Sequence, residues 1–154
     1  MLYTTLLNQL TFMRRKLQKL CRIKTVGVRT LVMNEQGQVL LLRHTYVSGW
    51  HFPGGGVDAC ETPVHAALRE AYEEAGITTH DRPTLLGIYY NTVYGADDYI
   101  ALYVIHSFIQ KEVKSPEIAE WGWFNIDELP EDVTASTRSR LSEYLSGVDV
   151  SDTW

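Results

Sequence analysis

The sequence predicts a mixed α/β domain, and two sets of local signals support this prediction. Between Thr62 and Gly76, helix start and stop signals enclose an apolar repeat of helical period. Turn-forming residues separate four β-rich runs, at 25–33, 39–46, 85–92 and 99–109. The chain of 154 residues has a single-domain length, and its 45% apolar and 21% charged residues are typical of a soluble globular protein.

The N-terminal segment, residues 1–24, is predicted to be an appended basic amphipathic helix. Leucine and methionine recur there at three- and four-residue spacing, with six basic side chains and no acidic one. Three interpretations stay open: packing on the domain or on a second subunit as a homodimer, contact with a membrane surface, or a flexible or targeting segment. No apolar run reaches the roughly 20 residues of a membrane-spanning helix, and no signal-peptide layout is present.

Charge and cysteine content narrow the class of function. Residues 25–154 contain eight of the 14 basic residues and all 19 acidic ones, so this part of the chain is strongly acidic. Such a surface argues against stable nucleic-acid binding, which needs basic side chains, and it suits a protein whose acids bind metal. Cys21 and Cys60 form no metal-ligand pair and no disulfide framework, which favours a cytoplasmic location. Cys60 is expected to be small and partly buried, without a nucleophilic role.

The first two β-rich runs, 25–33 and 39–46, are predicted to form a hairpin around a turn at 34–38. The second run leads the chain towards three consecutive glycines at 54–56. Arg43 lies near its end, where it could bind a substrate phosphate or pair with a carboxylate; the alternative is a solvated arginine at the end of a strand. The five histidines show no zinc-like spacing, and we treat them as ordinary surface or core residues.

A helix is predicted to follow, with Thr62 as its N-cap, Pro63 at its first position and Gly76 just past its end. An apolar stripe is expected to face the core. Its members recur at helical spacing: Val64, Leu68, Ala71, Tyr72 and Ala75.

Three acids, Glu70, Glu73 and Glu74, are expected on the opposite side of this helix. They repel one another, and no lysine lies among them, although Arg69 can pair with Glu73 one turn later. A hard divalent cation such as Mg²⁺ would compensate them, because it prefers oxygen ligands and bridges carboxylates to substrate phosphates. The glycines at 54–56 would let the backbone approach that metal or phosphate. The alternative is a solvated acidic helix face.

Later in the chain, strands are predicted at 85–92 and 99–109, and another strand ends at Phe124. An amphipathic helix is predicted at 135–146, and residues 147–154 are expected to form a C-terminal tail that frays. The tyrosines around the turn at 95–98, Tyr94 among them, could stack on a base, but most are expected to be β-forming residues.

From Gly55 to Ile77, the sequence resembles the signature of the Nudix hydrolases. The resemblance covers every charged and glycine position of that motif: Gly55, Glu61, Arg69, Glu70, Glu73, Glu74 and Gly76. Ala71 departs from the usual larger aliphatic residue, which bears on packing rather than chemistry. A pattern that fixes so many positions within 23 residues is far more specific than a lone glycine-rich loop. The order of elements over residues 25–146 is compatible with the same family.

The resemblance implies a Nudix fold, in which a mixed β-sheet is held between helices. It also implies Mg²⁺-dependent hydrolysis of a pyrophosphate bond in a nucleoside diphosphate linked to another group, with Mn²⁺ as an alternative ion. By correspondence, the metal ligands are Glu70, Glu74 and the main-chain oxygen of Gly54, and Glu73 is a third acidic ligand or an acid that orients the water. Arg69 would position Glu73, and Glu61 would support the loop or border the metals.

The resemblance also implies one acid from outside the motif. In the family, an acid shortly before a Trp-Phe pair reaches the metal site or acts as a base. Glu117 is the first choice here and Glu120 the alternative. Substrate contacts are expected from Gly55, Arg43 and Tyr94.

The motif does not select one substrate among nucleoside triphosphates, dinucleoside polyphosphates, nucleotide sugars and ADP-ribose. Thr92 stands where one ADP-ribose group carries a proline, and Tyr94 lies where diadenosine polyphosphate hydrolases often place a tyrosine. The competing hypothesis is a catalytically silent Nudix domain that binds a nucleotide or a partner as a sensor. Such domains commonly lose motif acids, all of which are present here, so we predict an enzyme.

Overall fold

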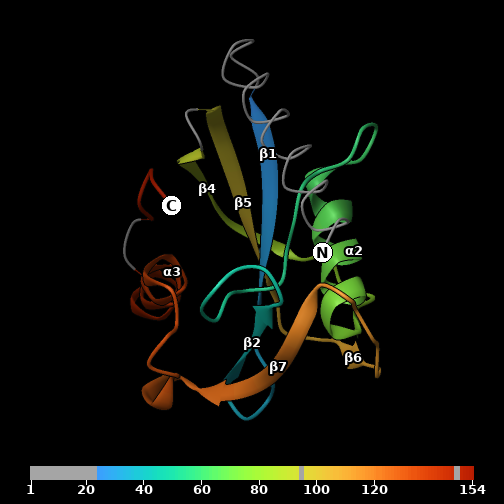
Figure 1. The fold of residues 1–154 in the computed structure, drawn as a ribbon. Helices are drawn as coiled ribbons and strands as arrows, with labels where there is room; N and C mark the ends of the chain where they lie inside the picture. The colour runs from blue at the N-terminus through green and yellow to red at the C-terminus, as the bar shows by residue number, and fades with distance from the viewer. Residues whose placement is uncertain (1–23, 94–95, 148–149) are drawn as a thin grey trace, which may run out of the picture.

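The computed structural model in Figure 1 describes residues 24–93, 96–147 and 150–154. The helix predicted within residues 1–24 and the predicted substrate contact Tyr94 therefore lie outside the described residues. The elements follow in the order β1 (Thr25–Val32), β2 (Gln38–His44), α2 (Pro63–Ala75), β3 (Ile77–Thr78), β4 (Thr84–Val93), β5 (Ala96–Ile105), β6 (Ile109–Gln110), β7 (Ile118–Asn125), the 3₁₀ helix η1 (Ile126–Glu128) and α3 (Ala135–Ser146).

The predicted α/β class is confirmed, with a strand at every β-rich run. The strand predicted over 99–109 is the least accurate, since β5 ends at Ile105 and β6 takes up the chain again at Ile109. Within the part of the chain that the structure describes, the helices lack the combined length and hydropathy of a membrane-spanning segment.

The central sheet has the strand order β1-β5-β4, with β1 parallel and β4 antiparallel to β5. A second pair joins β2 to β7 antiparallel. The predicted hairpin is therefore reduced to a single antiparallel bridge between Met33 and Val39, next to a turn that forms through a hydrogen bond of 3.0 Å from the Asn34 N–H to the Gln38 oxygen. Strands β1 and β2 both carry several buried apolar side chains, and each pairs with a strand from later in the chain, β1 with β5 and β2 with β7.

Helices α2 and α3 lie on opposite sides of the β1-β5-β4 sheet (Figure 1). Alternation along β1 explains this, because successive side chains point to opposite faces. Val28 packs against Ala66 and Ala67 of α2, whereas Leu31 belongs to the cluster that contains Leu141 of α3.

The helix α2 has the predicted ends, and its predicted apolar stripe is confirmed in part, since Ala71 and Ala75 are buried and Leu68 packs against the cluster that contains them. Thr62 accepts a hydrogen bond from the His65 N–H, and Gly76 ends the helix at a φ of +69°. The helix packs through small side chains, which let it approach the sheet closely: Ala66, Ala67, Ala71 and Ala75. Tyr72, predicted to be buried, is 46% exposed, and Glu74, predicted to lie opposite the core, is only 6% exposed. The larger apolar side chains were therefore a poor guide to the orientation of α2.

The C-terminal tail was predicted to fray, and this prediction is wrong for residues 150–154. The Tyr90 N–H donates to the Asp152 oxygen at 2.7 Å, and the Trp154 N–H donates to the Tyr90 oxygen at 2.9 Å. The Trp154 ring packs edge-on against buried Tyr89 with 5.5 Å between centroids. The Arg140 guanidinium stacks on both rings, and this cluster holds the tail against the edge of β4.

Replacing Trp154 by alanine is expected to lower the free energy of unfolding by roughly 1–3 kcal/mol, less than for a fully buried tryptophan, because part of its ring is solvated. Urea denaturation followed by circular dichroism measures this change. Val150→Ala in the same tail, where the side chain is 37% exposed, serves as the control and should change little. Equal denaturation midpoints for Trp154→Ala and the parent chain would contradict the packing role.

Candidate active site

A cavity of about 760 Å³ opens between α2 and the loop that precedes β7. One wall carries the glycine turn Gly54–Gly56 together with Arg69, Glu70, Glu73 and Glu74. Tyr46 and the loop residues 113–117 form the other wall. The structure thus brings the three predicted helix acids, the glycine turn and Glu117 to one cavity, and Glu120 is not among its lining residues.

The glycine turn approaches both β1 and α2 more closely than any side chain would allow. A Cβ on Gly54, whose φ is +149°, would lie 2.1 Å from the Val28 carbonyl oxygen. A Cβ on Gly55 would lie 2.5 Å from Oε1 of Glu70. The turn is held there by the Val28 N–H, which donates to the Gly55 oxygen at 2.9 Å. The turn backbone therefore passes directly beside the helix acids.

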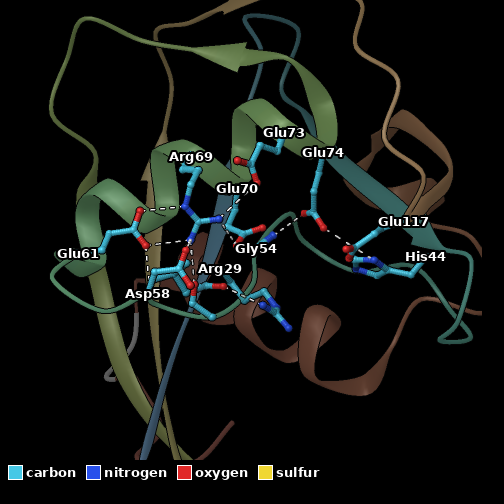
Figure 2. Close-up of polar contacts among 12 residues, drawn as sticks. Arg29, His44, Gly54, Asp58, Glu61, Arg69, Glu70, Glu73, Glu74 and Glu117 are labelled. Carbon is cyan, nitrogen blue, oxygen red and sulfur yellow. Dashed lines mark hydrogen bonds and ion pairs between the residues drawn. The ribbon is translucent and has the colours of Figure 1, made fainter. Parts of the chain in front are cut away.

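Glu74 is a buried carboxylate with one close hydrogen bond. The Gly54 N–H donates to its Oε2 at 2.8 Å (Figure 2), and Nδ1 of His44 lies 3.8 Å from Oε1. Burial raises the pKa of Glu74 to about 8; the Gly54 hydrogen bond opposes this rise and the nearby charge of Glu70 adds to it. The ionised form of Glu74 thus lacks a compensating positive charge in contact with it.

Arg69 lies at the centre of the acidic residues (Figure 2). Its Nε and Nη2 each donate to one oxygen of Glu61 at 2.9 Å, a bidentate pair that lowers the pKa of Glu61 to about 2. Its Nη1 donates to Glu70 at 2.6 Å and to Glu73 at 3.3 Å. The predicted pair with Glu73 is present but is the longest of these contacts, so Arg69 chiefly orients Glu61 and Glu70.

The loop between the glycine turn and α2 is closed by its own residues. The Asp58 N–H donates to Oε2 of Glu61 at 3.0 Å. Cys60 is exposed and has a φ of +64°, so the expectation that it would be partly buried is wrong. This left-handed conformation lies in the turn at residues 59–60 that precedes α2.

Glu117 and Glu120, the two candidates for the acid outside the motif, have different surroundings. Glu117 lines the cavity and accepts a hydrogen bond from the Tyr46 hydroxyl at 3.2 Å. Glu120 instead pairs with Arg43 at 3.1 Å. Arg43 also pairs with Asp132 at 2.8 Å, so its guanidinium has the carboxylate partners that were one of its two predicted roles.

Three residues that were not predicted to be functional lie around the site: Arg29, His44 and Tyr46. The His44 side chain is 8% exposed, and burial lowers its pKa to about 4. Burial, reinforced by the charge of Glu117, raises the pKa of Tyr46 to about 12. Arg29 was detectable in principle, since alternation along β1 places this charged residue on the same face as the core residue Leu31. No spacing pattern pointed to His44 or Tyr46.

The residues of the cavity fit a hard divalent cation. As placed, no three His, Cys, Asp or Glu side chains of the described ranges stand close enough together to form a complete ligand set. The donor chemistry is nevertheless suitable, because the carboxylates of Glu70 and Glu74 both touch the glycine turn and offer oxygen ligands. Burial raises the pKa of both groups, and a cation between them would favour their ionised forms.

The fold, the glycine turn and the acidic helix together define a Nudix-type hydrolase site. The model of the NUDIX domain matches residues 23–145, and the chain belongs to the Nudix hydrolase family. The predicted family, fold and enzyme class, a hydrolase acting on phosphoanhydride bonds, are thereby confirmed.

Relatives and solved structures extend this comparison. The chain is 32% identical over 142 residues to an RNA pyrophosphohydrolase of Bartonella bacilliformis, covering 73% of this chain and 84% of that protein. It is 29% identical over 125 residues to a MutT-like protein of Streptomyces ambofaciens, covering 81% and 79%. The crystal structure of a MutT NUDIX hydrolase from Burkholderia pseudomallei superimposes with a TM-score of 0.69 at 30% identity, covering 78% of this chain and 97% of that one.

Proposed function

We propose that this protein catalyses the Mg²⁺-dependent hydrolysis of a phosphoanhydride bond in a nucleoside diphosphate linked to another group. The observation that carries the proposal is the pair of carboxylates, Glu70 and Glu74, against the glycine turn that lines a cavity of about 760 Å³. Nucleoside triphosphates, dinucleoside polyphosphates, nucleotide sugars and ADP-ribose all contain such a bond.

Phosphate anhydrides resist attack by water because their negative oxygens repel the nucleophile, so catalysis needs positive charge and a positioned water. Bound Mg²⁺, or Mn²⁺ in its place, supplies positive charge to phosphate oxygens and lowers the pKa of a coordinated water. We assign its binding to Glu70, Glu73, Glu74 and the main-chain oxygen of Gly54. The backbone at Gly55 gives the substrate phosphates close access to the turn.

The remaining polar residues position the metal ligands and the water. Arg69 is already engaged by Glu61, Glu70 and Glu73, so it orients these acids rather than binding substrate. Glu117 faces them across the cavity, and we assign it to orient or deprotonate the attacking water. Arg43 then belongs to the scaffold that holds β7, with Glu120 and Asp132 as its partners.

Glu117→Gln is expected to lower kcat by roughly 10²–10⁴-fold, the range for loss of a general base, with a smaller change in KM. Steady-state kinetics on a substrate identified as described below measures both constants. Glu120→Gln is the matched control, since it removes the same charge three residues away on the Arg43 side. A larger loss of kcat in Glu120→Gln than in Glu117→Gln would exchange the two assignments.

A phosphate-release assay with Mg²⁺, with Mn²⁺ and with EDTA tests the proposed function. The panel should contain a nucleoside triphosphate, a dinucleoside polyphosphate, a nucleotide sugar, ADP-ribose and, because one relative is named an RNA pyrophosphohydrolase, an RNA bearing a 5′-triphosphate. Metal-dependent release from at least one compound is expected. Intact compounds throughout the panel, with folded protein and metal present, would contradict the proposal.

The homodimer and the membrane contact proposed for residues 1–24 stay predictions. Comparing the sedimentation and liposome binding of the full chain with those of a chain that starts at Arg22 separates them. Faster sedimentation of the full chain than its mass allows would support the dimer, and retention on liposomes would support membrane contact.

A further inference from the structure

A second cavity, of about 310 Å³, lies on the β1 side of the glycine turn. The residues Gly54–Gly56 and Tyr46 line both cavities, so the turn is the wall that the two cavities share. Thr25 and Asp98, which are register partners in the β1-β5 pair, also line the second cavity. The Asp98 carboxylate is already engaged, since the Thr25 hydroxyl donates to it at 2.6 Å.

Arg29 lines this second cavity and carries an uncompensated charge. Its Nη1 donates to the adjacent Val28 oxygen at 2.8 Å. Arg43, Arg69 and Arg140, which are also buried or partly buried, each pair with a carboxylate within 4 Å. Among the residues that the structure describes, no carboxylate stands within that distance of Arg29, although Glu74, Asp98 and Glu70 act on it from farther away. A partly buried guanidinium at a cavity wall normally has an anionic partner.

His44 also lines this cavity, and one of its two ring nitrogens has no hydrogen-bond partner in the ranges that the structure describes. Its side chain is 8% exposed, and Nδ1 forms no hydrogen bond within the described part of the chain. In Figure 2, Arg29 lies on the side of the Gly54 turn away from Glu73 and Glu74, and His44 lies beside Glu74 and Glu117. Within the described residues, the cavity is therefore lined by a guanidinium that contacts no carboxylate and by an imidazole nitrogen that has no hydrogen-bond partner.

We propose that Arg29 and His44 bind an additional phosphoryl group of the substrate, so that the protein prefers substrates with three or more linked phosphates over those with two. This inference rests on the proposed function, because it assumes that a diphosphate lies against the carboxylates of the first cavity. A chain of phosphates can cross the shared turn at Gly56, which lines both cavities and, its chain neighbours aside, has no heavy atom of the described residues within 4 Å of the place where a Cβ would lie. The fork of a guanidinium matches phosphoryl oxygens, and a neutral imidazole can donate one further hydrogen bond.

The test measures binding without turnover. Methylenediphosphonate and its homologue with three phosphorus atoms contain no hydrolysable anhydride and no base, and isothermal titration calorimetry with Mg²⁺ gives their affinities for the full chain. The parent protein is expected to bind the three-phosphorus compound at least tenfold more tightly. Arg29→Gln should lose most of this difference, while its affinity for methylenediphosphonate changes less than about twofold. Arg29→Lys, which keeps the charge without the fork, should retain part of the difference.

Arg138→Gln is the matched control, because it removes the same charge from an exposed position on α3 and should behave as the parent protein does. Similar affinities of the parent protein for both compounds, or binding of neither, would overturn the inference even if Arg29→Gln failed to fold. An Arg29→Gln protein that keeps the parent's ratio of affinities would also overturn the inference, because Arg29 would then contact another part of the substrate, such as a base. Equal loss of both affinities would overturn it as well, because Arg29 would then contact the metal-bound diphosphate. Since no hydrolysis is measured, an inactive enzyme would refute the proposed function without deciding this preference.

Discussion

Glu74→Gln is expected to lower kcat by roughly 10²–10³-fold, the loss typical when one preorganised electrostatic group is removed from an active site. Glutamine has the size of glutamate, and its amide oxygen can still accept the Gly54 N–H that now donates to Glu74 at 2.8 Å. The turn geometry should therefore persist, and the charge that holds the cation is lost. Steady-state kinetics across a range of Mg²⁺ concentrations should show a higher metal requirement together with the lower kcat.

Glu35→Gln is the matched control for this substitution. It removes an equal charge from an exposed position in the turn between β1 and β2, far along the chain from the glycine turn. Its kinetics and its metal requirement should equal those of the parent protein. Full activity of Glu74→Gln at the parent's Mg²⁺ concentration would remove Glu74 from the mechanism.

The parts of the fold that depend on local signals were predictable from the sequence. Thr62, Pro63 and Gly76 mark the ends of α2 because capping is a property of a few adjacent residues. Strand partners were not predictable in this way, since the apolar runs of β1 and β2 satisfy a hairpin and the observed pairings with β5 and β7 equally well. The pairing of residues 150–154 with β4 likewise depends on Trp154 and Arg140 meeting Tyr89, a contact between distant parts of the chain.

The residues of the candidate site also fall into those that local sequence predicts and those that only the tertiary fold brings together. Glu70, Glu73 and Glu74 belong to one helix, so their spacing alone brings them to one region, and the family motif marks them. Arg29 and His44 reach the glycine turn only because β1 and the end of β2 lie beside it. The sequence pattern also did not predict the burial of Glu74, because this burial results from α2 packing on the sheet through its alanines.

The burial of Glu74 predicts a specific pH dependence of stability in the absence of metal. Its pKa in the unfolded chain is the ordinary 4.5, and burial raises the folded value to about 8. Between these values the folded state keeps a proton that the unfolded state has lost, so this contribution to the free energy of unfolding is complete below about pH 4.5 and is lost as the pH approaches 8. At about 1.4 kcal/mol per pKa unit, the contribution is of the order of a few kcal/mol.

Other groups titrate in the same range, so the informative quantity is the difference between Glu74→Gln and the parent protein. His44 acts in the opposite direction, because its folded pKa of about 4 lies below the ordinary 6.5 and its contribution grows as the pH rises between them. Glu61, with a folded pKa of about 2, acts only below pH 4.5. Urea unfolding in EDTA from pH 5 to 8 should therefore show Glu74→Gln gaining stability over the parent protein as the pH rises. Mg²⁺ should reduce that gain in stability, because it favours the ionised carboxylate of the parent protein. Parallel curves of stability against pH for the two proteins in EDTA would show that burial does not raise the pKa of Glu74.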